Sequence, residues 1–96
     1  MTKVYGEDIE PLLVNERGEV TETDIANVVY VLDGQNYTPP TGCGLLPGVL
    51  RERLLGGGEL QERVLLTKDL ANVEKLYLIN DLRGWREAKL LDFKTA

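Results

Sequence analysis

Short turns that contain glycine divide this chain into brief runs of residues that favour β-strands. Asp33-Gly34 separates two such runs, and an Asp-Gly pair is a strong signal for a two-residue hairpin turn. Gly18 ends a similar turn earlier in the chain, and Arg83-Gly84 precedes the last run. Strands joined by tight turns pair antiparallel, so a mostly antiparallel sheet is predicted. The expected strands cover residues 12–14, 19–21, 28–32, 37–38, 61–66, 75–80 and 85–91.

Helices are expected between these strands. Pro47 suits the first turn of a helix that would end near Leu55, where three glycines follow. Its Arg51 and Arg53 are expected on the solvent face. Thr67 is expected to cap a second short helix over residues 68–73. The fold class is therefore α+β, a mostly antiparallel sheet with two or three short helices.

Composition removes several classes of function. The 96 residues include no histidine, no serine and one cysteine, Cys43, which excludes Ser-His and Cys-His catalysis and histidine-built metal sites. A lone thiol forms no internal disulfide, and no apolar run approaches the roughly 20 residues that span a bilayer, so a cytoplasmic protein is expected. The net charge of −5 argues against nucleic-acid and membrane partners. No metal site is expected.

Two polar stretches could carry chemistry. Residues 42–50 form a glycine-bearing loop that leads into a helix start, where free backbone N–H groups can hold an anion. This loop lacks the Walker A and GxGxxG patterns, and a plain structural loop is the alternative. The segment between Glu22 and Asn27 is the second stretch, and the alternative there is a solvated turn. Without a histidine to activate it, Cys43 is expected to be an inert packed thiol.

The order of the motifs adds a resemblance to a known family. In sequence they are Leu13–Glu22, Ala26-Asn27, Asp33-Gly34, Tyr37–Pro40, Cys43–Arg51 and Leu78–Trp85. This series, from about residue 12 to residue 90, resembles the C-terminal subdomain of class IV (fold type IV) pyridoxal-phosphate enzymes. The 4-amino-4-deoxychorismate lyases are the most similar branch, especially the form fused to aminobenzoate synthase component I. The expected organisation is an N-terminal arm, 1–10, and a class IV aminotransferase-like subdomain, 11–96.

The resemblance implies roles for particular residues toward pyridoxal 5'-phosphate. Glu22 would bond the pyridine nitrogen, and a carboxylate there keeps the ring protonated and electron-accepting. Asn27 would brace the loop, and the backbone N–H groups of Val49 and Leu50 would contact the phosphate. Asn80-Asp81 corresponds to a second phosphate-contacting turn. Thr38 belongs to a strand-ending motif and is carried over as structural only.

Two departures bear on activity. The family's Schiff-base lysine lies well upstream of the glutamate, and Lys3, nineteen positions before Glu22, is too close to be its counterpart. Asp81 stands where the family usually offers a hydroxyl to the phosphate, and a carboxylate near a phosphate costs on the order of 1 to 4 kcal/mol. The resemblance also implies an N-terminal subdomain that this sequence does not match.

These observations lead to one expected function and two alternatives. The expectation is an aminodeoxychorismate lyase-like fragment that is inactive alone. The first alternative is half of a split lyase of folate biosynthesis, which converts 4-amino-4-deoxychorismate to 4-aminobenzoate and pyruvate once a partner chain completes it. The second is a non-catalytic, self-associating module. The expected partner is a second copy in a homodimer or a complementary N-terminal subdomain chain.

Overall fold

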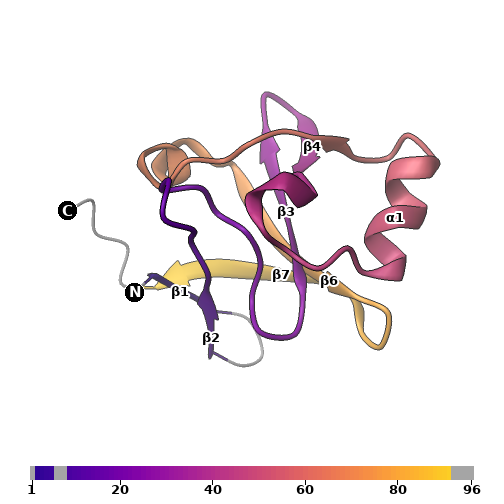
Figure 1. The fold of residues 1–96 in the computed structure, drawn as a ribbon, viewed down its shortest axis with the longest axis horizontal. Coiled ribbons are helices and arrows are strands. Elements are labelled where there is room, and N and C mark those ends of the chain that lie inside the picture. Colours follow the sequence, from indigo (N-terminus) through magenta and orange to yellow (C-terminus); the bar gives the residue numbers. More distant parts are fainter. Residues whose placement is uncertain (1, 6–8, 92–96) are drawn as a thin grey trace.

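The computed structural model describes residues 2–5 and 9–91, which form one seven-stranded sheet with helices beside it (Figure 1). The strand order is β2-β1-β7-β6-β3-β4-β5, and only β4 and β5 pair in parallel. This confirms the predicted α+β class and its mostly antiparallel sheet. The strands are β1 (Thr2–Tyr5), β2 (Ile9–Leu12), β3 (Asn27–Leu32), β4 (Gln35–Thr38), β5 (Gln61–Glu62), β6 (Lys75–Asn80) and β7 (Gly84–Leu91).

The β3–β4 and β6–β7 hairpins form as the turn residues predict. Asp33 and Gly34 have φ angles of 51° and 75°, so both adopt the left-handed conformation that a type I′ turn requires. Asp33 is the only residue other than glycine with positive φ among the described residues. Strand β4 begins at Gln35, two residues before the expected start, and Pro39 follows its end at Thr38.

The first predicted hairpin forms its turn without regular strands. Val14 and Val20 make only an isolated bridge, and the Thr21 N–H donates to the Leu13 C=O at 2.9 Å. The N–H of the buried Val20 donates to a different segment, the Leu65 C=O, at 2.8 Å. The predicted strands 12–14 and 19–21 are therefore wrong as regular strands, since each pairs over too short a length.

The segment expected as an arm contains strands that the sequence analysis did not predict. Thr2–Tyr5 pairs antiparallel with both β2 and β7, and Lys3 lies opposite Leu91. Strand β2 runs from Ile9 across the expected boundary at residue 10. This pairing joins the two ends of the described chain, so no local pattern could indicate it.

The helices differ from the prediction in detail. Helix α1 covers Val49–Gly56 and begins two residues after Pro47. A 3₁₀ helix, η1, covers Thr41–Cys43 in the expected loop, and a second one, η2, covers Thr67–Asn72. The predicted cap at Thr67 is wrong, because Thr67 lies inside η2 and no side chain caps that helix. The predicted strand 61–66 is also too long, because only Gln61–Glu62 pairs.

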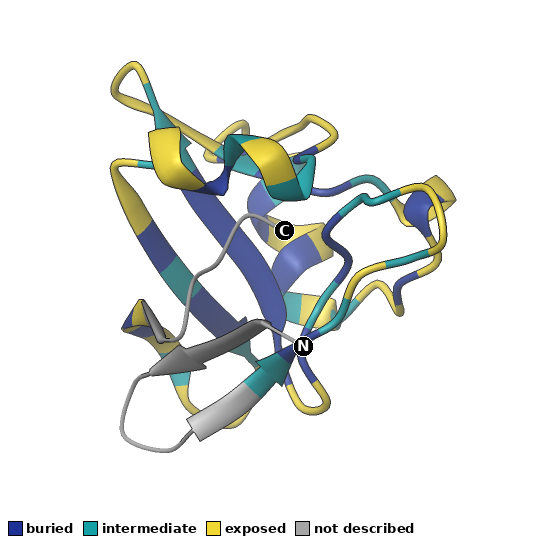
Figure 2. Ribbon diagram, turned by 90° about the vertical axis from the view of Figure 1, so that its left-hand side faces the viewer, coloured by how far each residue is buried: buried dark blue, intermediate teal, exposed yellow. Residues whose placement is uncertain are grey.

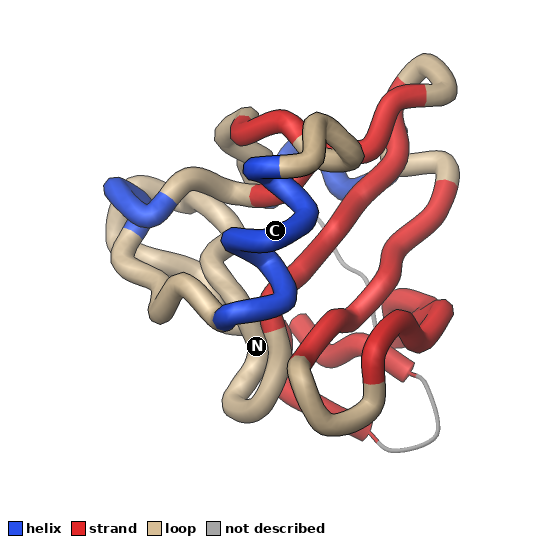
Figure 3. Tube along the Cα trace, turned by 90° about the vertical axis from the view of Figure 1, so that its right-hand side faces the viewer, coloured by secondary structure: helices blue, strands red, loops and turns tan. Residues whose placement is uncertain are grey.

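The core lies on both faces of the sheet (Figure 2). On one face, Val28, Tyr30, Leu76, Leu78 and Ala88 pack in a cluster with residues of the connecting loops. On the other face, Leu54 of α1 packs with Val29, Ile79 and Leu60, so α1 lies against β3 and β6 (Figure 3). No described helix is long and apolar enough to cross a membrane.

Arg51 contradicts the expectation that both arginines of α1 face solvent. Its side chain is 1% exposed, whereas Arg53 is exposed. The cause is mainly tertiary, because the guanidinium contacts acceptors at Pro39, just after β4, and at Glu62 of β5. Its burial has consequences for the site that α1 borders.

Candidate functional site

A depression of about 260 Å³ opens where the start of β3, the loop before α1 and the end of β6 meet. Three stretches of the chain contribute to its wall, and each one ends or begins a secondary-structure element. The lining residues belong to the ranges 22–27, 46–51 and 79–81, with Val49 outside the set.

The depression brings together most of the residues that the sequence singles out. Glu22, Asn27, Leu50, Asn80 and Asp81 all line it. Val49 does not line it and stands beside it as the exposed first residue of α1. The proximity of these residues is established, whereas their roles toward a cofactor stay predictions.

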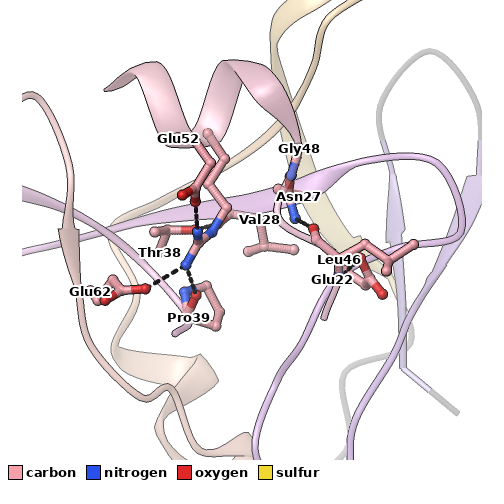
Figure 4. A network of polar contacts seen from close by, with 10 residues as sticks. Glu22, Asn27, Val28, Thr38, Pro39, Leu46, Gly48, Glu52 and Glu62 are labelled. Carbon is pink, nitrogen blue, oxygen red and sulfur yellow. Dashed lines mark hydrogen bonds and ion pairs between the residues drawn. The ribbon is translucent and has the colours of Figure 1, made fainter. Parts of the chain in front are cut away.

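The side chain of Asn27 fixes the loop that enters α1 (Figure 4). Its Nδ2 donates to the Leu46 C=O at 2.8 Å, and its Oδ1 accepts from the Gly48 N–H at 3.1 Å. Asn27 is buried and lies at the first position of β3, so the anchor is itself held by the sheet. The approach is so close that a Cβ on Gly48 would lie 2.7 Å from Asn27 Oδ1. This position therefore requires glycine.

Glu22 places a carboxylate at the mouth of the depression. It forms an isolated bridge with Asn27, and its Oε1 accepts from the Leu46 N–H at 3.2 Å. The Leu46 backbone thus accepts a hydrogen bond from Asn27 through its C=O and donates one to Glu22 through its N–H. A half-buried carboxylate held in this way can accept a hydrogen bond from a protonated ring nitrogen.

The first turn of α1 presents unoccupied N–H groups beside the depression. Gly48 is the N-cap residue, and no side chain caps the helix. The N–H groups of Val49 and Leu50 have no acceptor within the helix, because an α-helix leaves its first N–H groups unpaired. These donors, together with the helix dipole, favour an anion at this end of α1.

The Asn80-Asp81 turn contributes structure and charge. The Asn80 side chain donates to the Ile25 C=O at 3.1 Å and accepts from the Arg83 N–H at 2.7 Å, so both of its polar atoms hold the turn. Asp81 is exposed. Together with Glu22 and Asp24 it makes the lining acidic, and Arg51 is the only basic residue of the lining among the described residues.

Two threonines support the site through hydrogen bonds to the backbone, and of the two only Thr23 lines the depression. The Thr38 hydroxyl donates to the Val28 C=O at 2.7 Å and is fully buried, which agrees with its expected structural role. The Thr23 hydroxyl accepts from the Ala26 N–H at 3.0 Å and shapes the turn that precedes Asn27. Sequence reasoning missed Thr23, although threonine hydroxyls often bond nearby backbone N–H groups in turns, as Thr23 does with those of Ile25 and Ala26. It also missed Gly48 and Arg51, whose contacts come from distant segments.

Cys43 lies away from the depression. Its side chain is buried, and burial, aided by the nearby Glu19 carboxylate, raises the pKa of its thiol. The thiol therefore stays protonated at neutral pH, as an inert packed cysteine does. Asn15 donates to both the Glu19 carboxylate and the Cys43 C=O, which attaches the first turn to η1.

The depression has no lysine and no metal-ligand cluster in the part of the chain that is described. Lys68, Lys75 and Lys89 all lie outside its lining. Within residues 2–5 and 9–91, no group of three or more potential metal-ligating side chains is close enough to hold a metal ion. From the described residues, the depression is thus lined by a carboxylate and backbone donors and by no lysine amine.

Comparisons with known proteins give consistent matches. The family model described as "Amino-transferase class IV" matches residues 3–91. A Schizosaccharomyces pombe protein named "Putative aminodeoxychorismate lyase" is 42% identical over 82 residues, which cover 82% of this chain and 36% of that protein. Among solved structures, a "Putative amino-acid aminotransferase" from Mesorhizobium loti is 46% identical with a TM-score of 0.77, and covers 81% of this chain and 38% of that one.

A 4-amino-4-deoxychorismate lyase from Pseudomonas aeruginosa is also similar in structure. It is 30% identical with a TM-score of 0.71, and the likeness covers 81% of this chain and 31% of that one. The chain thus spans less than two fifths of the length of each of these relatives.

Proposed function

This chain belongs to the class IV amino-transferase family, and from that premise we propose that its depression forms one wall of a pyridoxal-phosphate site. The observation that carries the proposal is the convergence of Glu22, Asn27 and the uncapped end of α1 in one depression. We further propose that these 96 residues alone catalyse neither a lyase nor an aminotransferase reaction. A complementary segment or chain would supply the rest of the site.

The donor set of the depression fits the two ends of this cofactor. A carboxylate suits a protonated pyridine nitrogen, and free N–H groups at a helix start suit a phosphate. Glu22 would hold the proton on the ring nitrogen, and Val49 and Leu50 would bind the phosphate through their N–H groups. Asn27 would keep the loop in place, since it binds both Leu46 and Gly48. When bound, the cofactor supplies an electron sink for the carbon that bears the substrate's amino group.

Two observations support the need for a second wall. The described residues place no lysine at the depression, so the group that forms the Schiff base has to come from outside them. The relatives named above are more than twice as long as the matched region. We therefore propose that the complete site contains a lysine from a complementary polypeptide.

An apolar rim favours completion by another polypeptide. Ile25, Leu46 and Leu82 are 55%, 77% and 90% exposed, and each lines the depression or adjoins a residue that lines it. Exposed apolar side chains gathered at one site mark a contact surface. This supports the half-enzyme alternative, in which the joined site would act on 4-amino-4-deoxychorismate as the named lyases do.

Addition of pyridoxal phosphate to the 96-residue chain tests its inactivity. We expect no absorbance band of a lysine adduct, and no lysine modified in stoichiometric amount after borohydride reduction, because no lysine of the described residues lines the depression. Mass spectrometry of the reduced chain makes the measurement. The Glu22→Gln variant is the control, since random labelling of surface lysines does not depend on Glu22. A single lysine labelled fully in the wild type and not in the variant would contradict the proposal.

The charge of Asp81 gives a second prediction. The Asp81→Asn variant is expected to bind inorganic phosphate about fivefold more tightly at low salt, because removing an exposed like charge at short range gains about 1 kcal/mol. NMR titration of the Val49 and Leu50 amides measures this affinity. Asp33→Asn removes the same charge from a turn outside the depression and should leave the affinity within about twofold. Equal effects of the two variants would show that Asp81 does not act locally.

A further inference from the structure

Arg51 is the largest fully buried side chain of the described residues, although it lies on a short surface helix. Its neighbours Glu52 and Arg53 are exposed. A buried guanidinium is costly unless charged and polar groups surround it, so its partners indicate why it is there.

The partners of Arg51 come from three segments of the chain: α1, β5 and the residue after β4. Its Nη2 donates to the Glu62 carboxylate at 2.7 Å and to the Pro39 C=O at 3.0 Å, and its Nη1 pairs with Glu52 on the same helix. Glu62 ends β5, and Pro39 follows the last residue of β4. Figure 4 shows Glu52, Glu62 and Pro39 converging on this guanidinium. The forked, planar group can bind several acceptors in fixed directions, and it ties the first turn of α1 to two strand ends.

A second anchor holds the same turn from the other side. Gly48 is fixed by Asn27 of β3, and Arg51 is fixed by Pro39, just after β4, and by Glu62 of β5. The two residues between these anchors are Val49 and Leu50, whose N–H groups have no helical acceptor. The donors expected to meet an anion are therefore bracketed in sequence by two independent attachments to the sheet.

We propose that Arg51 is a positioning residue for the anion-binding end of α1. Its contacts with Glu62 and Pro39 set the direction of the Val49 and Leu50 N–H groups, and Arg51 acts through them without meeting the ligand. Arg51 lines the depression, and its Nε is buried without a hydrogen-bond partner among the described residues. Its Nη1 and Nη2 groups are already occupied by protein acceptors, which supports an indirect role. This inference rests on the proposed function, because it concerns the phosphate end of the same depression.

The Glu62→Gln variant separates positioning from simple charge. Removing an acid makes the chain less negative, so long-range electrostatics alone would strengthen phosphate binding. The glutamine amide oxygen can still accept from Arg51, but the charge-assisted bond is lost, so the first turn of α1 would be held less firmly and binding would weaken. The two effects have opposite signs, and Glu62 is partly exposed, so this variant should fold.

The measurement compares the affinities of the 96-residue chain for inorganic phosphate, pyridoxal phosphate and pyridoxal. At metal sites, loss of a residue that orients a ligand-binding group weakens binding about 10- to 100-fold. By analogy, we expect Glu62→Gln to weaken the binding of inorganic phosphate and of pyridoxal phosphate about tenfold. Pyridoxal, which lacks the phosphate, should keep its affinity within about twofold. Arg51→Lys should show the same pattern, because an ammonium cannot reproduce the forked contacts. Glu59→Gln, an exposed acid just after α1, controls for charge and should not weaken phosphate binding.

The possible binding results distinguish failure of the Arg51 inference from failure of the proposed function. Phosphate binding by Glu62→Gln that equals or exceeds the wild type overturns the role of Arg51 and leaves the proposed function intact. A proportional loss of phosphate and pyridoxal affinity would mean that Arg51 only supports the fold, which also overturns the inference. If neither inorganic phosphate nor pyridoxal phosphate shifts the NMR signals of the Val49 and Leu50 amides of the wild type, the proposed function fails, and this inference fails with it.

Discussion

The Gly48→Ala variant is expected to lose about 1–3 kcal/mol of unfolding free energy and most of its affinity for phosphate. A Cβ at this position would lie 2.7 Å from Asn27 Oδ1, so the loop or the asparagine has to move. Forcing an extra carbon into a packed contact typically costs this much. Movement of the loop would also displace the first turn of α1. Urea denaturation measures the stability, and NMR titration with phosphate measures the binding.

A double-mutant cycle identifies the contact that causes this loss. Asn27→Ala removes the clashing atom, so in its background Gly48→Ala should cost less than about 0.5 kcal/mol. Gly42→Ala is the matched control, because its added Cβ would meet nothing within 4 Å and its φ is not positive. We expect this control to change stability by no more than about 0.5 kcal/mol. Additive costs in the double mutant would show that Asn27 is not the cause.

The Leu78→Ala variant is expected to lower the free energy of unfolding by about 2–5 kcal/mol. Leu78 is fully buried in β6, opposite Val28 on one side and Arg86 on the other, so its loss leaves a cavity at the centre of the sheet. Small domains have only about 5–15 kcal/mol of stability in total, so this is a large fraction. Thermal and urea unfolding followed by circular dichroism make the measurement.

Leu82→Ala provides the matched comparison. It removes the same atoms from a side chain that is 90% exposed in the turn after β6. Its effect should stay within about 0.5 kcal/mol. Similar losses in the two variants would mean that the β6 face on which Leu78 lies is not the core of the fold.

Local signals in the sequence predicted the elements whose causes are local. The Asp33-Gly34 turn needs two residues with positive φ, and this need alone identifies the β3–β4 hairpin. The strand Thr2–Tyr5 was missed because its partner β7 lies at the other end of the chain. Thr67 was misassigned because a threonine before a polar run has the composition of a cap, whereas here it lies within a 3₁₀ turn.

In the candidate site too, the sequence predicted the features with local signals and missed those that depend on tertiary contacts. The order of motifs, read through a family resemblance, named Glu22, Asn27 and Asn80, which the fold does bring together. The amphipathic pattern of the predicted helix placed Arg51 in solvent, because a charged residue on a short helix is usually exposed. Its burial depends on acceptors at Pro39 and Glu62, which only the tertiary fold brings near. The need for glycine at position 48 likewise depends on an amide 21 residues away.

The pairing of β3 with β6 has a consequence for how ligand affinity is linked to folding. Asn27 lies opposite Ile79, so the walls of the depression come from segments about fifty positions apart in the chain. A helix of eight residues does not persist in isolation, so the anion donors of α1 are not organised in the unfolded chain. A ligand that contacts both the β3 side and the α1 side of the depression therefore has no affinity for unfolded molecules. Each tenfold increase in the concentration of such a ligand above its dissociation constant would raise the free energy of unfolding by about 1.4 kcal/mol.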